Sequence, residues 1–129
     1  MRAIGIVLAG GNNKNMKELS IKRAISAMPI AGSYRSIDFA LSNMTNSHIK
    51  KVAVITQYNA KSLNEHLSSS KWWDFGRKQG GLYVFTPTIT DDNGYWYRGT
   101  ADAIYQNLDF LKPEVRKYFF KDLPSVYSK

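Results

Sequence analysis

Cysteine is absent from this chain of 129 residues. The absence excludes disulfide frameworks and zinc sites with cysteine ligands, and it permits a reducing compartment. The apolar segment at the start is too short to span a bilayer, and it lacks the basic region that precedes an export signal. We therefore expect a cytoplasmic protein without membrane contact.

Acidic residues are fewer than basic ones: the chain has 10 acidic and 18 basic residues, and its formal net charge is +8. This balance favours anionic ligands: phosphorylated metabolites, nucleotides or nucleic acid. The cations are scattered instead of lying along one helix, and no zinc-finger or RRM signature accompanies them. We expect no nucleic-acid binding, and a basic nucleic-acid-binding module is the alternative from another class.

Repeats and low-complexity tracts are missing as well, and 43% of the residues are hydrophobic, enough for one modest core. Short apolar runs alternate with segments of helical periodicity, which predicts an α/β fold. The predicted elements are strands over residues 3–9, 51–57 and 82–90, a turn over 91–94, and helices over 37–48, 59–67 and from Thr100 to Lys112.

Several polar and aromatic side chains have plain structural interpretations. Ser36 and Thr100 are placed to cap two helices. Asp38 and Asp102 fall in the first turns of those helices, where a carboxylate is favourable, and we expect Asp38 to support the helix and not a metal. The aromatic members of this group are expected in packing or subunit contacts and not as cofactor platforms: Trp72, Trp73, Tyr95 and Trp96. We expect ordinary structural roles for His48 and His66.

The first apolar run leads directly into Gly10 and Gly11. A strand that is apolar on both faces belongs inside a covered parallel sheet, and small residues at its carboxyl end let a ligand approach the backbone there. The junction is neither G-x-G-x-x-G nor a P-loop, but its N–H groups could still hold phosphate. A simple strand-ending turn is the alternative.

Longer ordered motifs surround this junction: LAGG at 8–11, KRA at 22–24, YRSIDFALSN at 34–43, TQY at 56–58 and YRGTADA at 97–103. With these motifs the sequence resembles the ADP-glucose pyrophosphorylases, the glucose-1-phosphate adenylyltransferases of bacterial glycogen synthesis. The resemblance covers residues 1–112. It implies a Rossmann-like nucleotidyltransferase sheet with helices on both faces, incomplete in this chain.

In enzymes of that family glucose 1-phosphate attacks the α-phosphorus of ATP, Mg²⁺ steadies the charge, and ADP-glucose and pyrophosphate form. The resemblance implies nucleotide binding by Ala9, Gly10, Gly11, Gln57, Gly99 and Thr100, and phosphate or effector binding by Arg35 and Arg98. Gln57 would read the adenine edge. The alternatives are that Gln57 satisfies local backbone, that Arg35 is a solvated cation and that Arg98 pairs with Asp102.

Two positions depart from the pattern of catalytic members. Asn15 and Ile25 stand where those members carry an arginine and a lysine, and Ser26 replaces a proline. Losing such a charge typically costs on the order of 2.7–4 kcal/mol, or 10²–10³ in rate. The sequence therefore resembles the regulatory D-type subunit, weakly catalytic or non-catalytic, in a hetero-oligomer with a catalytic adenylyltransferase subunit.

An active transferase that uses nearby lysines is the alternative to that interpretation: Lys14, Lys17 and Lys22 lie close enough in sequence. A flexible lysine elsewhere in the loop would not reproduce the fixed geometry of the missing cations. Residues 113–129 resemble the connector that precedes the family's C-terminal β-helix. The family's Mg²⁺-binding aspartate motif should come before such a connector and does not, so we expect that the chain joins two segments that are distant in a parent protein.

Overall fold

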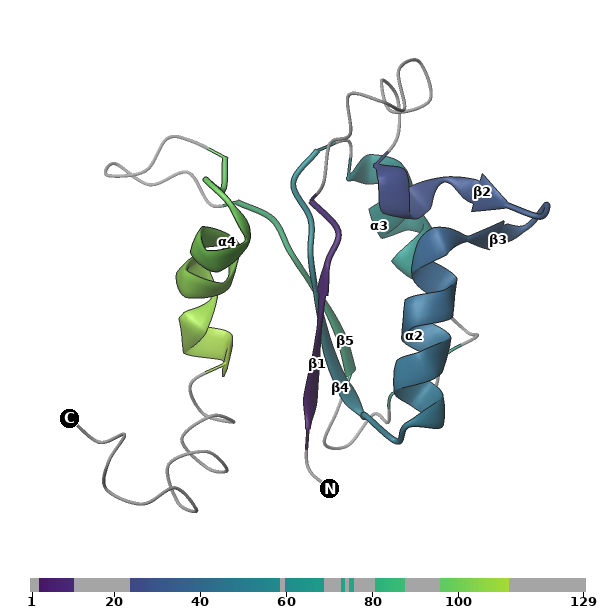
Figure 1. The fold of residues 1–129 in the computed structure, drawn as a ribbon, viewed down its shortest axis with the longest axis horizontal. Coiled ribbons are helices and arrows are strands. Elements are labelled where there is room, and N and C mark those ends of the chain that lie inside the picture. The colour runs from purple at the N-terminus through teal and green to yellow at the C-terminus, as the bar shows by residue number, and fades with distance from the viewer. Residues whose placement is uncertain are drawn as a thin grey trace.

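The computed structural model describes residues 3–10, 24–58, 60–68, 73, 75, 81–87 and 96–111. A parallel sheet of three strands lies between helices, with α2 and α3 on one face and α4 on the other (Figure 1). In chain order the elements are β1 (Ile4–Leu8), η2 (Ile25–Ala27), β2 (Pro29–Ile30), β3 (Tyr34–Arg35), α2 (Ser36–Asn46), β4 (Lys51–Ile55), α3 (Lys61–Ser68), β5 (Gly81–Phe85) and α4 (Thr100–Gln106). The predicted α/β fold with helices on both faces is confirmed.

The sheet has the strand order β1-β4-β5, and both pairings are parallel. Leu8 of β1 lies opposite Ile55 of β4, which lies opposite Phe85 of β5. The central strand β4 is buried from Val52 to its end, as expected of an apolar strand covered on both faces. This register brings the carboxyl ends of β1 and β4 side by side.

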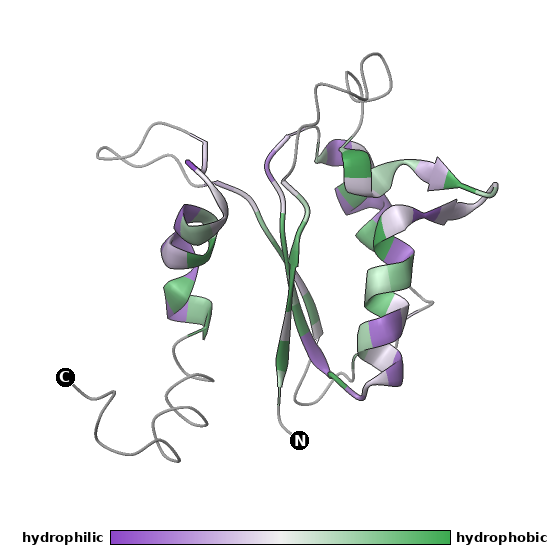
Figure 2. Ribbon diagram, in the orientation of Figure 1, coloured by the Kyte–Doolittle hydropathy of each residue, from purple (hydrophilic) through white to green (hydrophobic). Residues whose placement is uncertain are grey.

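Alternation along the strands divides the core between the two faces of the sheet. Val52 and Val54 face α2 and α3, where they pack with the fully buried Leu41 and Leu63. Ile55 belongs to the smaller cluster on the α4 side, together with Tyr97 and Ala103. Figure 2 shows hydrophobic residues concentrated in the strands, while the helices carry both polar and apolar residues.

A small hairpin lies between η2 and α2, where the sequence pattern predicts no strand. Residues Pro29 and Ile30 of β2 pair antiparallel with Arg35 and Tyr34 of β3, and the hairpin extends away from the sheet (Figure 1). Its turn contains Gly32 at φ 90°, a left-handed conformation that glycine adopts without a steric penalty. Strands of two residues are too short to produce an alternating pattern, so they could not be predicted from the hydrophobic periodicity.

Both predicted hydroxyl caps are wrong. Ser36 is the first residue of α2, and its Oγ donates to the carbonyl of Ile25 at 3.3 Å. Thr100 is likewise the first residue of α4. The N-cap position is Gly99, which has no side chain with which to cap the helix. The first-turn carboxylates take the role instead, because Asp38 accepts the backbone N–H of Arg35 and Asp102 that of Arg98, each at 2.8 Å.

Some predictions fall outside the described residues and are not tested. They concern Gly11, Asn15, Trp72, Tyr95, the lysines at 14, 17 and 22, the turn over 91–94 and the segment 113–129. The described part of α3 begins at Lys61, within the predicted helix. Among the helices that the structure describes, none is long and apolar enough to cross a membrane.

Candidate functional site

A pocket of about 310 Å³ lies where β1 and β4 end and α4 begins. Strand ends and a helix start form it together, at the edge of the sheet where parallel α/β folds bind ligands. Its volume lies at the lower end of the range for small-molecule sites. The lining residues are Leu8, Gly10, Ile55, Gln57, Tyr97, Gly99, Thr100 and Ala103.

One side of the pocket is formed by the ends of the two strands. The N–H of Ala9 donates to the carbonyl of Ile55 at 2.8 Å, which extends the pairing of β1 and β4 by one residue. Gly10 then lies against Gln57, and a Cβ at position 10 would stand 3.2 Å from the Cβ of Gln57. Glycine therefore permits a close approach between the two chain segments at the pocket wall.

The opposite side is formed by the segment that leads into α4. Tyr97 is 8% exposed and packs with Ile55 and Ala103, so the floor of the pocket is apolar. Asn107 fixes the tyrosine by donating from Nδ2 to the Tyr97 hydroxyl at 3.1 Å and to the Ala103 carbonyl at 2.8 Å. A flat apolar group could lie on this floor beside the amide of Gln57.

The structure brings four of the six predicted nucleotide-binding residues to this one pocket: Gly10, Gln57, Gly99 and Thr100. Ala9 is buried behind the wall at 5% exposure, and Gly11 lies outside the described residues. The space beside Gly99 is open, because no atom beyond its two chain neighbours comes within 4 Å of the place where a Cβ would be. Sequence reasoning missed the lining residues Leu8, Ile55, Tyr97 and Ala103, of which the first two share one face of their strands.

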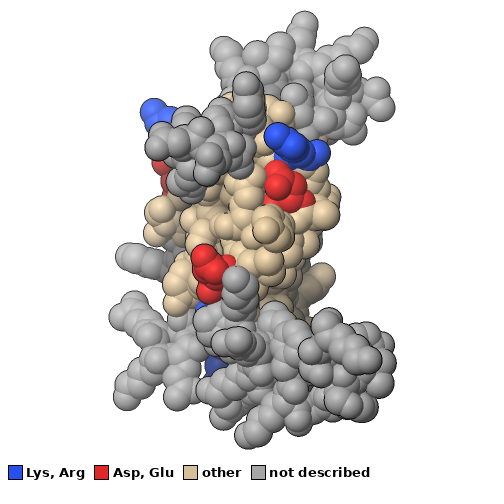
Figure 3. All heavy atoms as spheres, turned by 90° about the vertical axis from the view of Figure 1, so that its left-hand side faces the viewer, with Lys and Arg blue, Asp and Glu red and all other residues tan. Residues whose placement is uncertain are grey.

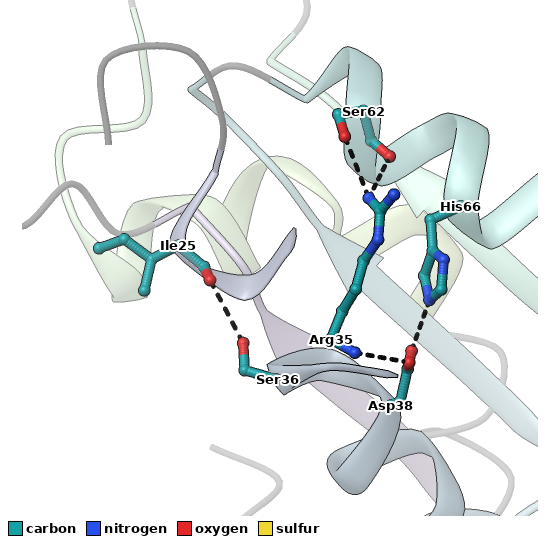
Figure 4. Close-up of polar contacts among 6 residues, drawn as sticks. All are labelled: Ile25, Arg35, Ser36, Asp38, Ser62 and His66. Atoms are coloured by element: carbon teal, nitrogen blue, oxygen red, sulfur yellow. Dashed lines mark hydrogen bonds and ion pairs between the residues drawn. The ribbon is translucent and has the colours of Figure 1, made fainter. Parts of the chain in front are cut away.

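Arg35 is engaged away from this pocket, at the junction of α2 and α3 (Figure 4). Its Nη1 donates to the carbonyl of Ser62 at 2.7 Å and to the Ser62 hydroxyl at 3.0 Å. The interpretation of Arg35 as a merely solvated cation is therefore wrong. Binding of phosphate or an effector by Arg35 stays a prediction, and the bonds to Ser62 hold its guanidinium in one place.

Asp38 links the same two helices and has the predicted structural role. Its Oδ2 accepts the Arg35 N–H at 2.8 Å, and its Oδ1 lies 2.6 Å from Nε2 of His66 on α3. A carboxylate only accepts, so Nε2 of His66 is the donor. Trp73 packs edge-on against this imidazole, with ring centroids 5.9 Å apart, and is partly buried against the core, in a packing role as predicted.

We expect Asp38→Ala to lower the free energy of unfolding by about 1–3 kcal/mol, because two polar partners lose their acceptor at a nearly buried position. Urea denaturation followed by circular dichroism measures the change. Glu65→Ala, at an exposed position of α3, is the control and should stay within about 0.5 kcal/mol of the unmodified chain. Equal effects of the two substitutions would contradict the assigned role of Asp38.

The remaining charged groups are considered only where the structure describes them. Arg98 contacts Asp102, as one interpretation proposed, but through its backbone N–H. The face that carries α4 shows only a few separate charged side chains among the described residues (Figure 3). Within the described part of the chain no three His, Asp or Glu side chains gather as metal ligands. The Mg²⁺ that the resemblance implies stays a prediction.

Comparison with known proteins gives consistent results. A family profile described as "Nucleotidyl transferase" matches residues 4–121. A glucose-1-phosphate adenylyltransferase of Clostridium kluyveri is 47% identical over 108 residues, 84% of this chain and 28% of the relative. The enzymes of the same name from Halalkalibacterium halodurans and Thermosipho africanus are 47% and 44% identical, over 84% of this chain in both cases. The chain spans 26–28% of the length of these relatives.

Proposed function

The chain belongs to the nucleotidyl transferase family, and from that premise we propose that its pocket binds an adenine nucleotide, as ATP or ADP-glucose. The observation that carries the proposal is the convergence of Gly10, Gln57, Gly99 and Thr100 on one cavity at the carboxyl ends of β1 and β4. These segments are far apart in the sequence. The resemblance assigned all four residues to nucleotide binding.

The chemistry of the lining suits an adenine base. Ile55, Tyr97 and Ala103 supply an apolar floor on which a flat ring can lie. The amide of Gln57 carries both a donor and an acceptor, which matches the edge of adenine, where an amino group and a ring nitrogen stand side by side. An amide that reads the N6–N7 edge favours adenine, because guanine presents two acceptors, O6 and N7, on the same edge.

Isothermal titration with ATP tests the proposal. We expect Gln57→Ala to raise the Kd for ATP by roughly 3- to 12-fold, because the base loses one or two neutral hydrogen bonds. Asn43→Ala removes an exposed amide from α2, on the other face of the sheet, and should leave the Kd unchanged. Equal affinity of the unmodified chain for GTP and ATP, or no effect of Gln57→Ala, would contradict the role of the amide.

For the whole protein we propose a subunit of glucose-1-phosphate adenylyltransferase, acting in the cytoplasm in glycogen synthesis. The proposed role is regulatory, beside a catalytic adenylyltransferase subunit in a hetero-oligomer. The support is chemical: Asn15 and Ile25 stand where catalytic members carry an arginine and a lysine, so two cations that would stabilise the leaving pyrophosphate are missing. Mg²⁺ enters this proposal only as a companion of the nucleotide.

Mixing the chain with a catalytic subunit separates this role from that of an independent transferase. We expect the chain alone to form little ADP-glucose from ATP, Mg²⁺ and glucose 1-phosphate, because it spans only 26–28% of the length of its relatives. A regulatory subunit in addition associates with the catalytic subunit and changes the rate of that subunit. Robust turnover by the chain alone would favour the active transferase. Size-exclusion chromatography of the mixture reports the association directly.

A further inference from the structure

Two aromatic rings meet beside the pocket. The rings of Tyr58 and Trp96 are stacked, with centroids 4.8 Å apart and an angle of 20° between their planes. Tyr58 directly follows Gln57, and Trp96 directly precedes Tyr97, so each ring adjoins a residue that lines the pocket. The stack therefore joins the segment that leaves β4 to the segment that enters α4.

Burial does not explain why a tryptophan stands at this position. Trp96 is 52% exposed and belongs to neither core cluster of the described residues. Its described contact is with Tyr58, across the gap between the two segments. An aromatic pair of this kind contributes about 0.5–1.5 kcal/mol of stability beyond area burial, enough to hold two short segments together.

The two sides of the pocket are otherwise tied down by separate contacts. The Ala9–Ile55 hydrogen bond fixes the end of β1 to β4, whereas Asn107 fixes Tyr97 to α4. Below these, Ile55 and Tyr97 pack together in the floor. Next to Gln57, the two sides of the pocket are joined by the stacked rings of Tyr58 and Trp96.

We propose that the Tyr58–Trp96 pair is a clasp that sets the distance between Gln57 and Gly99 and thereby the affinity of the pocket for its nucleotide. The inference rests on the proposed function. Tyr58 and Trp96 are positioning residues in this view, because each ring covers a face of the other and acts on the ligand through the neighbours Gln57 and Tyr97. The affinity then depends on the pair as a unit.

A double-mutant cycle read out by ATP titration tests the clasp. Tyr58→Ala and Trp96→Ala should each raise the Kd by roughly 2- to 12-fold, and the double variant should be no weaker than the weaker single variant. Trp96→Phe retains a flat ring and should restore most of the affinity. Trp96→Leu retains apolar bulk without an aromatic face and should behave like Trp96→Ala.

The outcomes separate the clasp from the function on which it rests. Absence of ATP binding by the unmodified chain would overturn both. If the unmodified chain binds ATP, the clasp is overturned by single variants with unchanged Kd, by effects that multiply in the double variant, or by full affinity in Trp96→Leu. An effect of Trp96→Ala without one of Tyr58→Ala would also overturn it, since Trp96 would then touch the ligand itself. Far-UV circular dichroism of each variant verifies the fold.

Discussion

Leu41→Ala is expected to lower the free energy of unfolding by about 2–5 kcal/mol, a large part of the stability of a small domain. Leu41 is fully buried on the face of α2 that packs against the sheet, among Val52, Val54 and Leu63. Truncation removes three carbon atoms from this contact and leaves a cavity that rigid neighbours fill only in part. Urea denaturation, followed by circular dichroism at 222 nm, measures the loss.

Phe39→Ala is the matched control on the same helix. Phe39 is 55% exposed and meets Tyr34 at a ring distance of 6.4 Å, outside the core. Its truncation removes more atoms than that of Leu41 but should cost less than about 1 kcal/mol, because most of the lost surface already faces water. A larger loss from Phe39→Ala than from Leu41→Ala would contradict the assignment of the inner face of α2.

The sheet could be predicted because its strands carry their signal locally. The run from Val52 to Ile55 is apolar on both faces, as is typical of a strand covered on both sides. The predicted strands 3–9 and 51–57 end within two residues of the observed β1 and β4. Helix α2 was recognisable for the same reason, since Ile37 and Leu41 recur at helical spacing and are both buried.

The hairpin and the helix starts could not be predicted, because partners distant in sequence determine them. Ser36 donates to a carbonyl eleven residues away, and Arg35 donates to Ser62, which lies 27 residues away. A hydroxyl before a helix is a cap only where no such partner competes for it. Asp38 took the capping contact because its carboxylate reaches the Arg35 N–H across the first turn.

Half of the pocket lining followed from the resemblance, and the other half required the fold. Motifs identify polar and glycine positions such as Gln57 and Gly99, whose chemistry is visible in the sequence. Tyr97 and Ala103 look like ordinary core residues, and only the packing of α4 against the sheet turns them into a pocket floor. Leu8, Tyr97 and Ala103 stand within the motifs that carry the resemblance, but an apolar side chain alone shows no chemistry that separates a binding role from a core role.

Gly10→Val is expected to raise the Kd for ATP by roughly 100-fold or more. The new side chain would overpack the pocket wall and would also displace the amide of Gln57 that binds the base in our proposal. The new Cβ would stand 3.2 Å from the Cβ of Gln57, and the branched methyl groups would occupy the wall shared by both residues. Gly10→Ala should give an intermediate loss. Asn43→Val, exposed on α2, adds a branched side chain on the other face of the sheet and should leave the Kd unchanged. Isothermal titration measures all three, and wild-type affinity in a folded Gly10→Val variant would place the nucleotide elsewhere.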